Sequence, residues 1–266
     1  MNCTYFHLNC NTTLFSSFDN KSRPFINPND FYRKSNKAYK TIIVTFSHKL
    51  KSSLIEKELI IPMDICIQSV AESISVFNIK GSDLLLFFTN VGAPITVGLL
   101  HELIYIYDIK NVVMFGSCGI LDKSINECEL IIPTSSYRDE GTSYHYVEPS
   151  DYIEIKNSKD LIGIFEELKI PYRKGKIWTT DAMYRETINN INKRKEEGCI
   201  AVEMEISAVQ ALCSYLNINY FPFIYGADRL DENIYNPSVL GNLNIDKRLF
   251  HYEIAKKIAL IIDNRY

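Results

Sequence analysis

The feature that most constrains the fold is a regular alternation of short apolar runs with amphipathic stretches, from about residue 39 to the C-terminus. Apolar runs of strand length occupy residues 39–46, 82–92, 111–119, 128–141, 175–181 and 220–228. Stretches with apolar residues at helical spacing occupy 95–108, 158–170, 207–218 and 247–266. Strands that alternate with helices predict an α/β fold with a mixed, largely parallel central sheet flanked by helices.

The alternation does not extend to the first 38 residues. They are polar, rich in Asn and Ser, and contain the turn-like segment "RPFINPNDF". No internal repeat and no linker divides the remainder of the chain. We therefore expect an irregular N-terminal arm over residues 1–38 and a single α/β domain over residues 39–266.

Composition excludes several classes of function. A net charge of −3 gives no electrostatic basis for binding nucleic acid or an anionic membrane. The longest apolar runs, such as "LLLFF", are too short to span a bilayer, and the first ten residues lack the pattern of a secretory signal. The seven cysteines form no CxxC pair. We expect a cytoplasmic protein with reduced thiols, no disulfide framework and no metal site.

Polar and glycine residues follow the apolar runs at the points where strands should end. These residues are "GSCG" (116–119), "RDE" (138–140), Asp181, "EME" (203–205) and Asp228. In α/β folds, ligands bind at the carboxyl ends of the strands. The positions therefore predict one binding site assembled from several strand ends, with "GSCG" forming a tight turn between a strand and a helix.

The segment "AVEME" (201–205) places Glu203 and Glu205 two residues apart. On a helix, such residues point in roughly opposite directions, about 200° apart, whereas in extended backbone they point the same way. A strand-to-helix elbow can present both acids to one ligand, with Met204 as an apolar surface between them. The alternative is two surface acids that simply favour the positive end of a helix.

Four blocks together carry a family resemblance: "VVMFGSCGIL", "TTDAMY", "AVEMEISAV" and "IYGADRLDE". In this order and spacing they resemble the nucleoside phosphorylase-I superfamily, which contains purine nucleoside phosphorylases, uridine phosphorylases and related nucleosidases. The resemblance runs from about residue 40 to the C-terminus and is strongest to the hexameric-type enzymes. It implies a phosphorylase/hydrolase-like fold and a homo-oligomer.

The resemblance assigns roles at the sugar and phosphate end of a nucleoside site. Glu205 binds the ribose 2′- and 3′-hydroxyls, Met204 packs under the sugar, and Glu203 supports the site. Ser117, together with Gly116, is the candidate phosphate-binding element. Cys118 is expected to be buried and inert.

At the base end, the resemblance makes Asp228 the acid that protonates N7 of a leaving purine. Met183 and Tyr184 cover the ring of the base. Arg138 and His145, in "YRDEGTSYHY", match the segment beside the base in the uridine branch. The Gln-x-Arg pair with which that branch reads a pyrimidine has no counterpart in "YRETINN", so a purine is favoured.

The chain departs from the family pattern where phosphate should bind. Met114 and Phe115 stand where the hexameric-type enzymes have an arginine, and "TFSHKLK" (45–51) stands in place of their glycine-Asp-Pro-x-x-Arg turn. Ser47, His48, Lys49 or Lys51 would have to hold the anion. The hydrolytic branch typically has a glutamate after the first strand, and this segment offers none.

These observations predict an enzyme of purine salvage that cleaves the N-glycosidic bond of a nucleoside. Phosphorolysis to free base and ribose 1-phosphate is the first reading, with phosphate as co-substrate and no cofactor. A hydrolytic nucleosidase and a non-catalytic nucleoside-binding protein are the alternatives.

Overall fold

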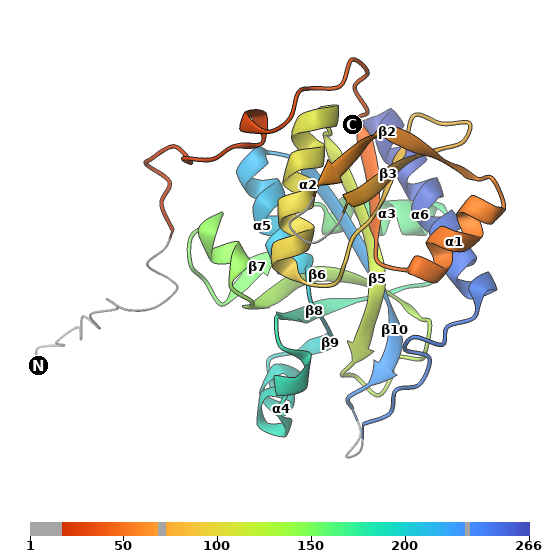
Figure 1. Ribbon diagram of the computed structural model, residues 1–266. Helices are drawn as coiled ribbons and strands as arrows, with labels where there is room; N and C mark the ends of the chain where they lie inside the picture. The colour runs from red at the N-terminus through yellow and green to blue at the C-terminus, as the bar shows by residue number, and fades with distance from the viewer. Residues whose placement is uncertain (1–17, 69–72, 232–234) are drawn as a thin grey trace, which may run out of the picture.

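The computed structural model describes residues 18–68, 73–231 and 235–266 and has the expected α/β architecture (Figure 1). In chain order the elements are η2 (Pro28–Asp30), β1 (Thr41–Thr45), α1 (His48–Glu56), β2 (Ile60–Gln68), β3 (Ser73–Ile79), β4 (Leu85–Phe88), α2 (Ala93–Tyr107), β5 (Asn111–Ile120), β6 (Leu130–Asp139), η3 (Thr142–His145), β7 (Tyr152–Glu154), α3 (Ser158–Glu167), β8 (Arg173–Thr180), η4 (Met183–Arg185), α4 (Ile188–Glu196), β9 (Cys199–Glu203), α5 (Ile206–Leu216), β10 (Asn219–Arg229) and α6 (Ile245–Arg265).

The described strands form one mixed sheet of ten, with the order β10-β6-β8-β9-β5-β1-β4-β3-β2 and β7 beside β6. Strand β5 is parallel to both β1 and β10, and β1 is parallel to β4. Because β10 also pairs with β5, strands β5, β10, β6, β8 and β9 form a closed circuit. The sheet is therefore open on the β2 side and closed into a small barrel on the other side.

Helices cover both faces of the sheet because successive strand residues point to opposite sides. Ile42 and Val44 pack with α2 and α5 in one apolar cluster, whereas Ile43 packs with α1, α3 and α6 in another. Figure 1 shows these two helical layers on either side of the strands. The β-branched run of β1 thus lies buried on both faces, as expected for a central parallel strand.

The sequence analysis missed several elements. Helices α1 and α4 and the antiparallel pair of β2 and β3 were not expected, and the run 82–92 is a strand only from Leu85 to Phe88. Gly92 already belongs to the next element, since it is the N-cap of α2 with a φ of 121°, a conformation that favours glycine.

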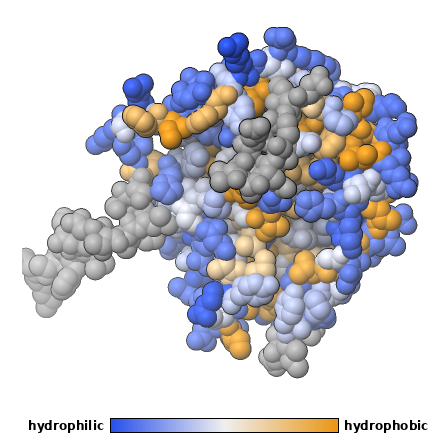
Figure 2. Space-filling model, in the orientation of Figure 1, coloured by the Kyte–Doolittle hydropathy of each residue, from blue (hydrophilic) through white to orange (hydrophobic). Residues whose placement is uncertain are grey.

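The described part of the expected arm, residues 18–38, contains only the short helix η2. It lies against α2, where the Ser35 N–H donates to the carbonyl of Ile106 at 2.7 Å. Residues 1–17 lie outside the described residues, so the domain boundary stays a prediction. Hydrophilic side chains dominate the face seen in Figure 2, with smaller apolar areas between them. Within the described residues, no helix combines the length and apolar character needed to cross a bilayer.

Candidate active site

A cavity of about 660 Å³ lies where the carboxyl ends of β5, β9 and β10 meet. In Figure 1 the arrowheads of β5 and β10 lie together, close to β9 and α4. Residues from the end of β1, from η4 and from α4 complete the wall. The described lining consists of Phe46, Val91, Met114, Gly116, Ser117, Cys118, Gly119, Met183, Tyr184, Glu186, Ile188, Ile191, Val202, Glu203, Met204, Glu205, Ile224, Asp228, Leu230, Tyr235 and Leu240.

Glu203 joins the end of β9 to the start of α5. The first N–H groups of a helix have no partner within the helix. The Oε2 atom of Glu203 accepts the N–H of Glu205 at 2.7 Å and that of Ile206 at 2.8 Å, and Oε1 accepts the hydroxyl of Thr179. Glu203 therefore caps the helix while it also lies on the cavity wall. Both glutamates are buried, so the alternative of two surface acids is wrong.

Glu205 has a different set of partners. Its Oε1 accepts the N–H of Gly92 at 2.6 Å, so the side chain links the N-terminus of α5 to that of α2. Burial raises the pKa of both glutamates, and the charge of Glu203 raises that of Glu205 further. The elbow thus presents Glu205 and the half-buried Met204 to the cavity, while Glu203 fixes the backbone that carries them.

Asp228 lies on the same cavity wall and belongs to β10, at a point where the register with β5 is irregular. It is 9% exposed, and the hydroxyl of Tyr235 donates to its Oδ2 at 3.3 Å. Burial raises the pKa of Asp228. At Gly119, its partner in β5, a Cβ would lie 2.4 Å from a methyl carbon of Leu230 and 2.9 Å from one of Val202. The glycine therefore leaves space for these two side chains, which line the same cavity.

Gly116 and Ser117 lie on the cavity wall, but the predicted turn is wrong. Both residues belong to β5, which continues to Ile120, and a loop rather than a helix follows. Gly116 leaves space for the ring of Phe46, which would be 3.1 Å from a Cβ. The glycines therefore serve close packing of side chains against a strand, and Ser117 has no helix N-terminus behind it.

Met183 and Tyr184 come from the short helix η4 and lie at the rim of the cavity. Met183 is 48% exposed and Tyr184 is 94% exposed. Their apolar surfaces face solvent at this rim, where a flat ring can pack against them.

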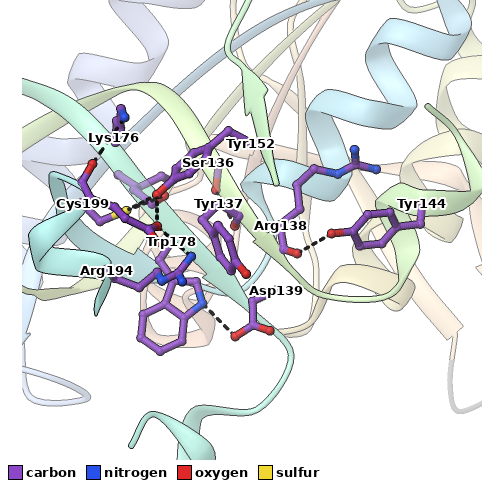
Figure 3. Close-up of polar contacts among 12 residues, drawn as sticks. Ser136, Tyr137, Arg138, Asp139, Tyr144, Tyr152, Lys176, Trp178, Arg194 and Cys199 are labelled. Carbon is purple, nitrogen blue, oxygen red and sulfur yellow. Dashed lines mark hydrogen bonds and ion pairs between the residues drawn. The ribbon is translucent and has the colours of Figure 1, made fainter. Parts of the chain in front are cut away.

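Arg138 and His145 are not among the residues that line the cavity. Arg138 is buried, donates from Nε to the hydroxyl of Ser143 at 2.8 Å, and lies over the ring of Tyr144 (Figure 3). His145 lines a separate, shallow hollow of about 470 Å³ beside Asp181. The structure thus brings together eight of the ten predicted site residues and leaves these two apart.

Sequence reasoning missed Glu186, which lines the cavity directly after η4. Burial, and next the charge of Asp228, raises the pKa of Glu186 to about 7. Its only sequence signal was its place two residues after the "TTDAMY" block. The apolar wall formed by Ile188, Ile191 and Leu230 was also not expected.

The cavity wall is acidic. Its four ionisable carboxyl groups are Glu186, Glu203, Glu205 and Asp228, and its described lining contains no Lys, Arg or His. The residues outside the described ranges include no lysine or arginine either. Within the described ranges, no group of three or more His, Cys, Asp or Glu residues is arranged to hold a metal ion.

The basic residues considered for phosphate point elsewhere. The Nζ of Lys49 donates to the carbonyl of Gly241 at 2.8 Å, and that of Lys51 lies over the ring of Phe77. The hydroxyl of Ser47 accepts the N–H of Leu50 and so caps α1. Ser47, His48, Lys49 and Lys51 are all absent from the cavity lining.

Comparison with known proteins gives a consistent result. The family model described as "Phosphorylase superfamily" matches residues 42–263. A purine nucleoside phosphorylase (DeoD-type) of Bacillus cereus is 26% identical over 154 residues, which is 57% of this chain and 66% of that protein. The chain therefore spans slightly less than two thirds of this relative's length.

Two solved structures share the fold. Purine nucleoside phosphorylase from Toxoplasma gondii gives a TM-score of 0.70 at 18% identity, covering 88% of this chain and 95% of that one. AMP nucleosidase from Bacteroides thetaiotaomicron gives a TM-score of 0.66 at 16% identity, covering 87% and 91%. At these identities the likeness concerns the fold, and the phosphorylase/hydrolase-like architecture expected from the sequence is confirmed.

Proposed function

The chain belongs to the phosphorylase superfamily, and from this premise we propose that it cleaves the N-glycosidic bond of a purine nucleoside. The observation that carries the proposal is the presence of Glu205 and Asp228 on the wall of one cavity of about 660 Å³. This volume lies within the range of about 300–1,000 Å³ that is usual for small-molecule sites.

Two sets of side chains on the cavity wall suit the two parts of a nucleoside. Glu205 offers carboxyl oxygens to vicinal hydroxyls, and Met204 offers an apolar surface to the sugar carbons. Asp228 is buried and its pKa is raised, which favours a protonated acid that can serve a departing base. Met183 and Tyr184 lie at the rim, where they can cover the ring.

The reaction separates charge along the bond that breaks. As C1′ and N9 part, the bonding electrons go to the base and positive charge develops on the sugar. Asp228 donates its proton to N7 of the base. The carboxyl oxygens of Glu205 accept hydrogen bonds from the sugar hydroxyls, and these oriented dipoles stabilise the positive charge that develops on the sugar. A nucleophile then bonds to C1′.

The charge of the cavity supports water as that nucleophile. Phosphate carries between one and two negative charges at neutral pH, and the described lining offers it four carboxyl groups and no cation to balance that charge. Moving an anion from water into such a site without a cationic partner is costly. Water adds no charge, gives free ribose, and loses a proton to the solvent or to a carboxylate.

Phosphorolysis is the second candidate. It is supported by the name of the Bacillus cereus relative, a purine nucleoside phosphorylase, and by Ser117, whose exposed side chain lies on the cavity wall. A cation from a neighbouring subunit would be needed to neutralise the anion. The proposal also includes three expectations from the sequence: a homo-oligomer, a cytoplasmic location and a role in purine salvage. Sedimentation analysis measures the oligomeric state.

A product assay tests the proposal. Inosine, adenosine and uridine are each incubated with the protein in phosphate-free buffer and in buffer with phosphate. We expect release of purine base and free ribose at a rate that phosphate does not change. Ribose 1-phosphate formed at a phosphate-dependent rate would establish phosphorolysis instead. If binding is detected but no base is released, the protein is a non-catalytic nucleoside binder.

A further inference from the structure

Glu186 is a half-buried acid with no evident structural task. It is the C-cap residue of η4, and its carboxyl group lines the same cavity as Asp228. The chain around it is otherwise exposed, from Asp181 to Arg185 and again at Thr187. Glu186 thus points inward from an exposed segment, into the cavity that Asp228 also lines.

The groups that face this carboxyl group from the neighbouring elements are acidic or phenolic. Asp228 comes from β10, and Tyr235 follows β10 and donates its hydroxyl to Asp228 Oδ2 at 3.3 Å. Tyr184 comes from η4, and Glu203 and Glu205 lie on the same cavity wall.

The basic residues near this end of β10 have other partners. Arg229 forms an ion pair with Asp231 at 2.6 Å and donates to the carbonyl of Ile125. The Nζ of Lys195 donates to the carbonyl of Leu230 at 3.4 Å. Neither side chain lines the cavity, and the exposed Arg185 next to Glu186 does not line it either. Glu186 and Asp228 therefore share one cavity wall that has no described counter-cation.

Two carboxyl groups in one partly desolvated site do not readily ionise together. When they are close, they share one proton, and the second ionisation is displaced to a higher pH. The pKa directions agree with this behaviour, because burial and the charge of Asp228 raise the pKa of Glu186 to about 7 and burial raises that of Asp228.

We propose that Glu186 and Asp228 form a carboxyl pair that retains one proton at neutral pH, and that this proton is the one transferred to the leaving base. The inference rests on the proposed function. In the transfer, the O–H bond that holds the proton of the pair breaks, the proton passes through Asp228 and bonds to N7, and the C1′–N9 electron pair goes to the base. The pair is left doubly ionised and recovers a proton from water after the base departs. Glu186 acts through Asp228, as a positioning residue for the proton.

The pH dependence of kcat/KM with a purine nucleoside tests this role. Activity requires the protonated pair, so it is lost as pH rises through the upper pKa of the pair. In Glu186→Gln the repelling charge is absent, and we expect the alkaline limb to move down by about one pH unit or more. Glu186→Asp keeps a carboxyl group, so its alkaline limb should lie close to that of the wild type. Glu196→Gln, at an exposed position on α4, is the matched control and should leave the limb in place.

A substrate with a permanent positive charge on its base provides the second arm. A purine nucleoside methylated at N7 leaves without a proton, so its rate should show neither the alkaline limb nor the effect of Glu186→Gln on that limb. If Glu186→Gln lowers the rate at every pH without moving the limb, Glu186 has a structural role and the carboxyl pair is rejected.

A readout without turnover separates this inference from the proposed function. In protein labelled with ¹³C at the carboxyl carbons of Glu and Asp, NMR follows the titration of Glu186 in the ligand-free protein. We expect it to titrate near pH 7 and to move to lower pH in Asp228→Asn. If it titrates at the ordinary value for glutamate, or if Asp228→Asn leaves it unchanged, no pair exists, whether or not nucleosides are cleaved. A coupled titration in a protein that cleaves no nucleoside would instead refute the proposed function.

Discussion

Two buried polar regions of the molecule treat charge in opposite ways. The first is the cavity, and the second is a group we call the β6–β8 cluster, made up of Tyr137, Arg138, Tyr144, Tyr152, Trp178 and Arg194 (Figure 3). In the cluster, Arg138 donates from Nη1 to the carbonyl of Glu148 at 2.8 Å and lies 4.1 Å from the centre of the Tyr144 ring. Arg194 lies 3.4 Å from the centre of the Tyr137 ring and pairs with Glu197 at 2.9 Å.

In the cavity, by contrast, four carboxyl groups share one wall and no cation in the described lining balances them. Their pKa values are raised, with burial as the largest cause. Buried charge that serves only the fold is normally paired and hydrogen-bonded. The difference therefore indicates that the cluster holds the barrel together, whereas the cavity keeps acids in a costly state that a ligand can use.

The largest expected effect is a loss of activity when an acid of the cavity is replaced. General acid catalysis typically contributes about 10²- to 10⁴-fold, so Asp228→Asn should lower kcat by that factor with natural purine nucleosides. The free energy of unfolding should change little, because the amide keeps the shape of the side chain. Steady-state kinetics and urea denaturation of the same preparation measure both quantities.

The substrate methylated at N7 is the control for Asp228→Asn, because it needs no proton and should be cleaved at nearly the wild-type rate. Equal slowing of both substrates would mean that Asp228 is structural, and the purine assignment would lose its main support.

A somewhat smaller effect should appear in the β6–β8 cluster as a loss of stability. Arg138→Met removes the donors to Ser143 and Glu148. A buried acceptor left without a partner costs about 1–3 kcal/mol, so we expect the free energy of unfolding to fall by about 2–4 kcal/mol. Activity per folded molecule should persist, since Arg138 does not line the cavity.

Arg33→Met, at an exposed position in the arm, is the comparison for Arg138→Met and should leave the unfolding free energy nearly unchanged. A folded, stable Arg138→Met protein that had lost activity would reverse the assignment of the two regions and return Arg138 to the site, as the sequence resemblance suggested.

The smallest expected effect is a decrease in the free energy of unfolding with rising pH, caused by the buried acids of the cavity. Glu205 has a raised pKa in the folded protein, so above the ordinary glutamate value the folded state binds more protons than the unfolded state. Stability then falls as pH rises, by at most about 1.4 kcal/mol per pH unit for each such group. Urea denaturation at pH 6.5 and pH 7.5 should show this loss in the wild type and a shallower one in Glu205→Gln.

The buried histidines contribute with the opposite sign in the lower part of this interval, because burial is the largest cause that lowers the pKa of His101, and that of His251 to about 4. Their contribution is the same in the wild type and in Glu205→Gln, so the difference between the two slopes reports on Glu205. Glu196→Gln should keep the wild-type slope. An identical slope in Glu205→Gln would mean that Glu205 is ionised in the folded protein at neutral pH, and the contrast between the two regions would weaken.

Local pattern was sufficient to predict the central elements. The β-branched run at 41–45 and the helical spacing at 207–218 correspond to β1 and α5. The elbow at Glu203 and Glu205 followed from side-chain periodicity alone. By contrast, α4 has only polar and charged residues apart from Ile188 and Ile191, so its sequence "INNINKRKE" shows no apolar face of helical width.

Features that depend on contacts between distant segments could not be predicted. Gly116 and Gly119 indicated a turn, but they lie within β5 because Phe46 and Leu230 pack against that strand. The burial of Glu186 arises only when η4 meets the end of β10. The hydrogen bonds of Arg138 to Ser143 in η3 and to the carbonyl of Glu148 likewise depend on how the loop after β6 returns to the sheet.

The acidic cavity wall also determines which metabolites can approach it. A nucleoside is uncharged, whereas a nucleotide with the same base and sugar brings about two negative charges on its phosphate. The field of the four carboxyl groups, where they are ionised, slows the encounter with the nucleotide before any contact is made, and added salt relieves this repulsion while leaving the nucleoside unaffected. A pocket built in this way disfavours phosphorylated purines at long range, without a steric barrier.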